Sequence, residues 1–412
     1  MVKENAMKQT EIGLIPEDWE IFKIEELTPS NIKYTIVDGP FGSNLKTIHY
    51  RKKGIPIITS GYVTDGKFFA SSYLFVDIEK FKQEKRSSVQ PGDIVMAKIG
   101  ERCGASAILP LNHPESILSG NALKIKIDNK RFSTNLISQI LYNDYLRGKL
   151  NELRTIGAQP AISMANLKKY KIPLPPLAEQ EAIAAALSDC DAWIESLEAV
   201  IAKKRLIKQG AMQKLLTPKE EWEVKKLGEV ADIIGGGTPS TFMSKYWNGN
   251  IEWFTPTEVG YSKYLYSSRR KISDLGFKNA SANLLPKNSI LLTSRAGIGD
   301  LGILKIEACT NQGFQSIVCK ENIDFEFIYY LMSTKKDDLL RNASGSTFLE
   351  ISPNKVKSLE IEIPSLSEQT RIATVLSDMD AELEALGQKL NKARQIKQGM
   401  MQELLTGRVR LV

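Results

Sequence analysis

Two glycine-rich stretches contain the residue types of a nucleotide site, but neither has the surroundings that such a site needs. Residues 61–68, GYVTDGKF, have the glycine and lysine spacing of a phosphate-binding loop. In that loop the residue after the lysine supplies a hydroxyl group to Mg²⁺, and here it is Phe68. An Asp-Gly pair between apolar runs is typical of a hairpin, so we predict a hairpin turn at residues 65–66.

The second stretch, residues 297–302 (GIGDLG), matches the dinucleotide-binding fingerprint and follows a strand-like run at 290–293. That fingerprint works by placing a helix N-terminus beside the pyrophosphate. Residues 303–306 (ILKI) are instead typical of a strand. We therefore predict a glycine-rich hairpin here and not a cofactor site.

The histidines and cysteines do not form a metal-binding or catalytic pattern. His49 and His113 have no ligand neighbours at helical or hairpin spacing, and neither anchors a plausible catalytic triad. The cysteines show no CxxC pairing, and we interpret them as free thiols in a reducing compartment; they are Cys103, Cys190, Cys309 and Cys319. We predict no catalytic residue, no metal and no cofactor, which favours a binding protein over an enzyme.

The residues that favour binding lie in loops that combine glycine, small polar side chains, cations and aromatics. Residues 39–46 (GPFGSNLK) lead into 49–53 (HYRKK), and 235–240 (GGGTPS) lead to 245–250 (KYWNGN). Lys and Arg contact DNA phosphates, whereas Ser, Thr, Asn and Gln can read base edges. For any single cation, a solvated surface charge is the alternative. The candidate DNA-binding residues are Ser43, Asn44, Lys46, Tyr50, Arg51, Lys98, Arg102, Gln159, Thr238, Ser240, Tyr246, Trp247, Lys263, Arg295, Ser346 and Thr347, and Arg269, Arg270 and Lys271 form a basic cluster with Lys263.

The elements that must position these loops include a long duplicated segment. Residues 175–217 and 364–406 match without a gap, from a shared Glu-Gln pair to a shared Leu-Leu-Thr ending. Each copy opens with proline, which suits a helix entrance, and its apolar residues alternate at spacings of three and four, which indicates a heptad seam. We predict two long coiled-coil helices with the core residues Ile183, Leu187, Ile194, Leu197, Ile201, Leu215, Ile372, Leu376, Leu383, Leu386, Leu390 and Leu404.

The two core lysines favour an antiparallel pairing of these helices. Lys208 and Lys397 occupy matching positions, so a parallel, in-register pair would place two ammonium groups together. An antiparallel pair avoids this, and we expect Lys208 near Glu368 and Lys397 near Glu179; a snorkelling lysine is the alternative. A helix of ~40 residues spans roughly 60 Å and would hold the globular regions apart about a pseudo-two-fold axis.

The globular regions predict a mixed α/β (α+β) fold class with an internal repeat. Strand-like runs at 55–59, 93–97 and 121–127 precede a helix-like segment at 134–153. The second region repeats the first in outline and begins at Trp222 as the first begins at Trp19. We expect globular domains at 1–172 and 218–362, followed by long helices at 173–217 and 363–412. Near-identical helices and diverged globular regions predict a shared task for the helices and a separate task for each region.

The composition is that of an ordinary soluble globular protein. The chain of 412 residues suggests two to three domains, with 42% hydrophobic and 25% charged residues. A net charge of +7 mildly favours an anionic partner. We find no signal peptide and no apolar run of the roughly 20 residues that a membrane span needs, so we expect a cytoplasmic protein without a membrane partner.

From end to end the chain resembles the specificity (S) subunit of type I restriction–modification systems. The resemblance rests on the duplicated Pro-x-Leu-x-Glu-Gln helix with its Lys-Gln-Gly-x-Met-Gln-x-Leu-Leu-Thr ending, on IPEDW at 15–19 and on GTPS at 237–240. It implies that each globular region is a target recognition domain for one half of a bipartite double-stranded DNA sequence. It also implies that the helices form an antiparallel coiled coil, which acts as a ruler between the half-sites.

The same resemblance implies the partners. Two methyltransferase (M) subunits would dock and bring S-adenosylmethionine and adenine-N6 methylation, and restriction (R) subunits would add ATP-driven translocation and cleavage. The chain itself would be non-catalytic. Two alternatives remain open: a specificity subunit of a system with a methyltransferase only, and a free-standing bivalent DNA-binding protein.

Overall fold

The computed structural model describes residues 6–40, 42–64, 66–155, 159–295, 297–345 and 349–411, with only the backbone of Ser43. The chain divides into two compact units, Met1–Leu197 with Lys389–Val412, and Glu198–Gln388. Both predicted long helices are confirmed: α4 is Leu177–Leu215 and α10 is Leu366–Leu404. Each begins directly after its proline-containing entrance, and each unit combines one globular region with part of both helices.

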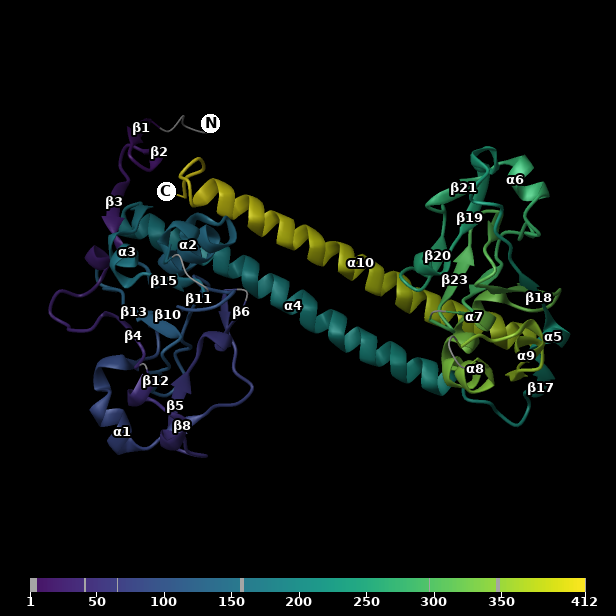
Figure 1. The fold of residues 1–412 in the computed structure, drawn as a ribbon, viewed down its shortest axis with the longest axis horizontal. Helices are drawn as coiled ribbons and strands as arrows, with labels where there is room; N and C mark the ends of the chain where they lie inside the picture. Colours follow the sequence, from purple (N-terminus) through teal and green to yellow (C-terminus); the bar gives the residue numbers. More distant parts are fainter. Residues whose placement is uncertain are drawn as a thin grey trace. The chain divides into compact units, whose positions relative to one another are not determined.

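The first unit is built on two four-stranded sheets (Figure 1). One has the order β11-β10-β13-β4 and contains β4 (Ile36–Asp38), β10 (Ile94–Ala97), β11 (Ser106–Ile108) and β13 (Ala122–Ile125). The other has the order β8-β5-β12-β9 and contains β5 (Ile55–Ile58), β8 (Phe75–Val76), β9 (Ser88–Val89) and β12 (Ser116–Leu118). The strand pairs are β1 (Met7–Thr10) with β2 (Gly13–Pro16), β3 (Glu20–Lys23) with β16 (Lys171–Leu174), β6 (Val63–Thr64) with β7 (Lys67–Phe68), and β14 (Arg154–Thr155) with β15 (Ala161–Ile162). The helices are α1 (Ile78–Gln83), α2 (Thr134–Leu146) and α3 (Met164–Lys169).

The three strands predicted in this unit are confirmed as β5, β10 and β13, but the predicted helix at 134–153 is shorter. Ser133 caps the start of α2 with its side-chain oxygen, which accepts from the backbone N–H of Leu136. Gly148 then takes a left-handed conformation at φ 73°, which favours glycine and ends the helix. Residues Lys149–Leu153 form a separate 3₁₀ turn.

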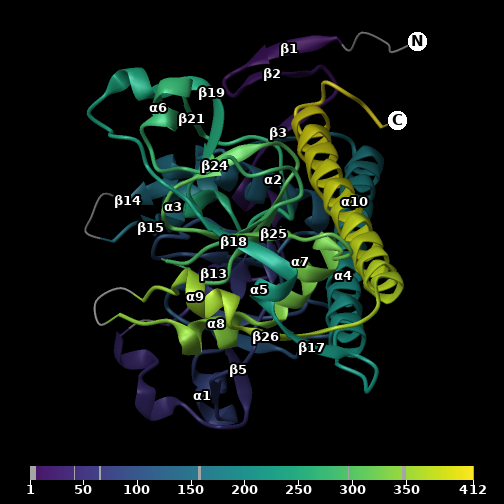
Figure 2. The same ribbon diagram turned by 90° about the vertical axis from the view of Figure 1, so that its right-hand side faces the viewer.

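The second unit contains a five-stranded sheet, a three-stranded sheet and a strand pair. The first has the order β18-β25-β22-β23-β20 and contains β18 (Ala231–Gly235), β20 (Tyr264–Leu265), β22 (Ile290–Leu292), β23 (Leu301–Leu304) and β25 (Gln315–Cys319). The second has the order β21-β19-β24 and contains β19 (Trp247–Phe254), β21 (Arg270–Ile272) and β24 (Ala308–Thr310), and the pair is β17 (Glu223–Lys226) with β26 (Glu360–Ile363). The helices are α5 (Leu227–Val230), α6 (Asp274–Lys278), α7 (Phe325–Thr334), α8 (Lys336–Asn342) and α9 (Pro353–Lys357). Figures 1 and 2 show β19, β21 and α6 at the end of this unit away from β17 and β26.

The two units share one topology, which extends the outline resemblance expected from the sequence. The order β11-β10-β13-β4 corresponds to β23-β22-β25-β18. The parallel pair β5–β12 corresponds to β19–β24, and the antiparallel pair β3–β16 corresponds to β17–β26. Trp19 and Trp222, at the start of each region, are buried. The internal repeat therefore includes the main sheets of both globular regions and is not confined to the helices.

Each long helix packs its apolar stripe into the globular cores as well as against the other helix. In the first unit Ile183 and Leu187 of α4 share a core with Met401 and Leu404 of α10. In the second unit Ile372 and Leu376 of α10 occupy the equivalent place. Of the predicted seam residues, Ile183, Leu187, Ile194, Leu197, Ile201, Ile372, Leu376 and Leu404 are buried, and Leu215, Leu383, Leu386 and Leu390 are half-buried.

The helices run antiparallel within each unit, but the ion pairs expected from the sequence are wrong. Lys397 Nζ lies 2.6 Å from Asp191 Oδ1 in the first unit, and Lys208 pairs with Asp380 in the second. Lys208 does not meet Glu368, which bonds Lys219 and Arg371 of its own unit. Lys397 does not meet Glu179, which lies twelve residues before Asp191 on α4, about 18 Å along the helix axis, and pairs with Arg410. The observed pairs are related by the internal repeat, so each unit has the same lysine–aspartate contact.

Both glycine-rich stretches form the predicted hairpins. Strands β6 and β7 pair antiparallel with Val63 opposite Phe68; Asp65 itself lies outside the described residues. Strands β22 and β23 pair antiparallel across the second glycine-rich turn, and a strand follows it instead of the helix that a dinucleotide site needs.

Candidate nucleic-acid interface

The first predicted loop follows β4 and is fixed by its own hydrogen bonds. The backbone of Ser43 lies in a 3₁₀ turn, Gly42–Asn44, and Asn44 and Lys46 are exposed. The Arg51 guanidinium donates to the carbonyls of Ile48 and Tyr50 at 2.8 and 3.1 Å, and pairs with Asp77 at 2.9 Å. The loop therefore presents Asn44 and Lys46 from a defined backbone, whereas Tyr50 is half-buried and packs against the core beside Ile57.

A second group of predicted residues in the same unit meets at the turn between β10 and β11. Ile99 bridges Ala161, and the Gly100 N–H donates to Pro160 O at 3.1 Å, which brings Lys98 and Arg102 to the segment that contains Gln159. Lys98 Nζ lies 2.5 Å from Asp38 Oδ2, and its side chain is 14% exposed. Arg102 is exposed and donates to Thr64 Oγ1 at 3.2 Å.

In the second unit four predicted residues lie in one cluster. Thr238 and Ser240 come from the loop after β18, Tyr246 ends the 3₁₀ turn Ser244–Tyr246, and Trp247 begins β19. The indole of Trp247 donates to Ser240 O at 3.2 Å, and the indole of Trp253 donates to Gly237 O at 2.9 Å. The two tryptophans thus tie the glycine-rich loop to the strand that follows it.

Arg270 belongs to this cluster, although the sequence showed it only as one member of a basic run. Its guanidinium carbon lies 3.7 Å from the ring centroid of Trp247. Antiparallel pairing of β19 with β21 sets Arg270 opposite Trp253, and a register shift between Trp247 and Ile251 brings Trp247 alongside. No local sequence signal reports this pairing.

Lys263 has a different environment from the other candidates. Its ammonium donates to Glu326 Oε2 at 3.1 Å, to Tyr330 OH at 2.8 Å and to Ser377 Oγ at 2.8 Å. The side chain is 10% exposed, and burial lowers the pKa of its ammonium group. Because all three N–H donors have internal partners, Lys263 fastens β20 to α7 and α10, and we leave it out of the proposed interface.

Arg295 lies at the turn between β22 and β23, the position that corresponds to Lys98 and Arg102 in the first unit. Its Nε lies 2.8 Å from Glu350 Oε1. The remaining candidates, Ser346 and Thr347, lie outside the described residues.

The repeated Glu-Gln pair has a structural role that the sequence did not reveal. The Gln180 amide donates to Pro175 O at 2.8 Å and accepts from the Ser133 backbone N–H at 2.9 Å. Gln369 makes the same two contacts with Pro364 O and the Asp324 N–H, at 2.9 and 3.0 Å. Each glutamine therefore joins the entrance of a long helix to the start of α2 or α7. Its identity in both copies was the only signal.

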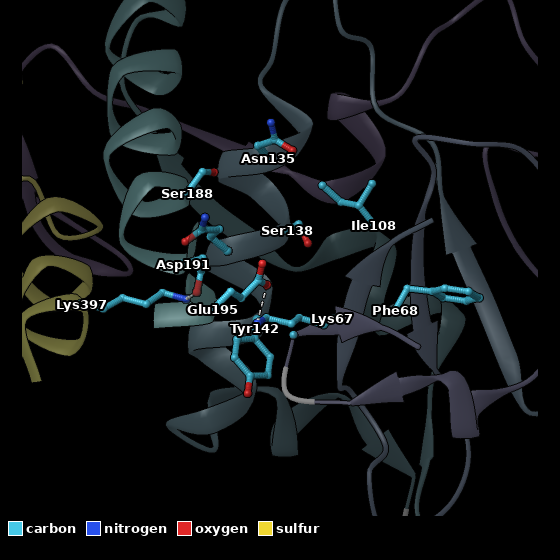
Figure 3. A pocket seen from close by; sticks show the side chains of 12 residues that line it. Lys67, Phe68, Ile108, Asn135, Ser138, Tyr142, Ser188, Asp191, Glu195 and Lys397 are labelled. Carbon is cyan, nitrogen blue, oxygen red and sulfur yellow. Dashed lines mark hydrogen bonds and ion pairs between the residues drawn. The ribbon is translucent and has the colours of Figure 1, made fainter. Parts of the chain in front are cut away.

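A polar hollow of about 350 Å³ lies in the first unit between the β6–β7 hairpin, α2, α4 and α10 (Figure 3). Lys67 of the hairpin pairs with Glu195 of α4 at 2.7 Å, and Lys397 pairs with Asp191 across it. The first pair attaches the hairpin to α4, and the second joins α4 to α10. In the described part of the chain, no three His, Cys, Asp or Glu side chains come close enough together to hold a metal ion. Within those same residues, no helix is long and apolar enough to cross a membrane.

Two α/β units of one topology, each built on antiparallel segments of long helices, define a two-module protein with an internal repeat. The family model of the type I restriction modification DNA specificity domain matches residues 16–204 and 219–395. The chain therefore belongs to the family of type I restriction–modification specificity subunits.

Individual relatives agree with this assignment. The chain is 28% identical to a putative type I restriction enzyme MjaX specificity subunit of Methanocaldococcus jannaschii, over 99% of this chain and 98% of the relative. It is 44% identical to the MjaIX specificity subunit of the same organism, but only over 39% of this chain and 38% of the relative. The S subunit structure from M. genitalium has a similar fold, with a TM-score of 0.59 and 15% identity over 94% of this chain and 96% of that chain.

Proposed function

We propose that this chain is the DNA-sequence-recognition subunit of a type I enzyme and reads a bipartite double-stranded target, with one globular domain for each half-site. The observation that carries the proposal is that two units with one topology differ in the loops that hold the cations, amides and aromatics. A shared scaffold with different loops suits two readers of different sequences. We propose domain boundaries at 1–172 and 218–362, with the long helices at 173–217 and 363–412.

Each domain offers both kinds of contact that DNA recognition needs. In the first, Lys46 supplies charge for phosphates and Asn44 supplies an amide for base edges, while Arg51 holds the loop through Asp77. In the second, the cluster of Thr238, Ser240, Tyr246 and Trp247 supplies hydroxyls and aromatic faces. The chain itself carries no chemistry in this proposal; methyl transfer and DNA cleavage belong to its partners in the cytoplasm.

We place the docking of two M subunits on the faces of α4 and α10 that the repeat preserves. Ile207 and Ile396 are repeat-related and 46% and 40% exposed. Gly210 and Gly399 are also repeat-related, and a Cβ on either would meet no described atom within 4 Å. Glycine inside a helix costs about 1 kcal/mol relative to alanine, so its presence in both copies supports close approach by an external partner. A surface that occurs twice suits a partner that binds twice.

The docking surface is tested with G210L/G399L and a matched control. Gly387 also lies inside α10 with no described atom within 4 Å of an added Cβ, but its repeat counterpart is Glu198. G210L/G399L should abolish co-purification with the methyltransferase while raising the thermal midpoint, and G387L should raise the midpoint without loss of co-purification. Full co-purification of G210L/G399L would place the docking surface elsewhere.

Half-site recognition is tested by exchanging residues 21–170 for those of another specificity subunit and mapping methylated sites. We expect one half-site to change and the other to persist; a change in both would exclude independent reading. Inserting one heptad into both helices should lengthen the unread spacer by about 10 Å, or roughly 3 base pairs. An unchanged spacer would exclude the ruler.

Co-purification and DNA-binding measurements also distinguish the type I subunit from the two alternatives. Co-purification with a methyltransferase but no restriction subunit would indicate a methyltransferase-only system. Tight sequence-specific binding by the chain alone, with no methyltransferase bound, would indicate a free-standing DNA-binding protein.

A further inference from the structure

We infer that Arg270 reads a guanine in the half-site of the second domain, and that Trp247 holds its guanidinium in the orientation for that contact. The inference rests on the proposed function, since it names a base-reading residue within one proposed recognition domain.

Two tryptophans lie beneath the Arg270 guanidinium, and contacts with the core fix their positions. Trp253 is 3% exposed and donates its indole N–H to Gly237 O. Trp247 packs edge-on against Trp253, with ring centroids 5.1 Å apart and an interplanar angle of 85°. Trp247 is further fixed by its hydrogen bond to Ser240 O. The Arg270 guanidinium lies 3.7 Å from the Trp247 centroid and 5.5 Å from that of Trp253.

The backbone around Arg270 is equally well defined. Ser268 Oγ donates to Arg270 O at 2.6 Å, and the Ser268 N–H donates to Glu252 at 2.7 Å. Glu252 also pairs with Lys271 at 2.6 Å, so this neighbouring cation is neutralised within the strand pair. Among the described residues, no hydrogen bond or ion pair engages the guanidinium of Arg270, which is exposed.

The position of the Arg270 guanidinium indicates which chemical groups it can bind. A guanidinium that lies over an indole keeps its N–H groups at the edge of its plane, where they can donate in pairs. The O6 and N7 atoms of guanine in the major groove form the base edge that matches this planar fork. Phosphate oxygens can match the same fork. Ser240, an exposed residue that can contact a base edge, accepts the indole N–H of Trp247 with its carbonyl, and this favours a base.

The test measures binding by the complex with the methyltransferase to duplexes in which each base pair of the second half-site is changed in turn. The wild type should discriminate against the change at one G·C pair by about 10- to 100-fold. R270K keeps the charge but loses the fork, so it should lose this preference at that position only, with the other preferences and the thermal midpoint unchanged. Equal weakening at all sequences, with a shallower salt dependence, would assign Arg270 to a phosphate and overturn the inference.

Three further variants distinguish the positioning role of Trp247 from the effect of charge at this site. W247L should relax discrimination at the same base pair as R270K, and W247F should restore it, because phenylalanine retains an aromatic face for the guanidinium. K271A removes the adjacent, ion-paired cation and should leave every base preference in place. If the wild-type complex bound all duplexes equally, the proposed function would be wrong. Wild-type discrimination that survives in R270K would refute only this inference.

Discussion

Arg410, near the C-terminus, forms ion pairs with two carboxylates of the first unit. Substitution of Arg410 should destabilise that unit strongly. Arg410 donates to both carboxylate oxygens of Glu179, at 2.7 and 2.6 Å, and to both oxygens of Asp18, at 2.8 and 2.6 Å. The Glu179 side chain is 0% exposed, whereas Asp18 is 51% exposed. Replacement of Arg410 by methionine therefore leaves one buried carboxylate without its ion-pair partner, while Asp18 can be solvated.

The burial of each carboxylate sets the size of the effect. Breaking a buried ion pair by removing one partner costs about 3–5 kcal/mol, whereas an exposed pair contributes about 0–1 kcal/mol. Glu179 thus accounts for most of the loss in R410M. For a unit of this size, 1 kcal/mol corresponds to roughly 2–4 °C, so the thermal midpoint of the first unit should fall by about 10 °C.

The assay is thermal and urea unfolding of the full chain, followed by fluorescence or circular dichroism. R408A is the matched control, because Arg408 is 50% exposed and lies 3.5 Å from Glu403, and it should change stability by less than about 1 kcal/mol. E179Q/R410M should recover part of the loss, since the glutamine carries no buried charge. A midpoint for R410M within 2 °C of R408A would refute the reasoning (about 1 kcal/mol or less).

Three further outcomes follow from side chains of the second unit. Q369L should cost about 2–4 kcal/mol in urea unfolding because it leaves polar backbone groups unpaired, whereas the exposed Gln388→Leu should change stability by less than about 0.5 kcal/mol. Partial or full burial raises the pKa of Cys309 to about 11 and of Cys319 to about 12, so iodoacetamide at pH 8 should modify both much more slowly in the native than in the urea-unfolded chain; equal rates would contradict the raised pKa values. Hydrogen bonds from a neighbouring arginine and lysine lower the pKa of Glu368 from 4.5 to about 2, so this stabilisation is present above pH 4.5 and is lost as the pH falls to about 2. The difference in unfolding free energy between wild type and E368Q should shrink over that interval, and a constant difference would contradict the lowered pKa.

The long helices could be predicted closely from the sequence because their signals are local. Heptad spacing and proline entrances lie within each segment, and both helices begin where these signals place them. The register could not be read in the same way. An antiparallel pair can set each lysine against the glutamate or against the aspartate, depending on its register. Asp191 lies twelve residues after Glu179, about 18 Å along α4, and Asp380 lies twelve residues after Glu368 on α10, so only one of the two pairings fits a given register.

The candidate interface shows the same division between local and distant information. The composition of the glycine-rich segments predicts loops. Both stretches with the spacing of a nucleotide site form hairpins, as the sequence predicts. Lys263 has the composition of a surface cation, yet α7 and α10 supply its acceptors from residues more than sixty positions away. The position of Arg270 on Trp247 depends on strand pairing and a register shift, which no local pattern encodes.

The most direct test of the proposed function is a map of methylated adenines in cells that express the cognate methyltransferase with and without this chain. The proposed function predicts that a bipartite motif, two short half-sites separated by an unread spacer of fixed length, becomes methylated only when the chain is present. Methylation that is independent of the chain, or a continuous motif without a spacer, would contradict it.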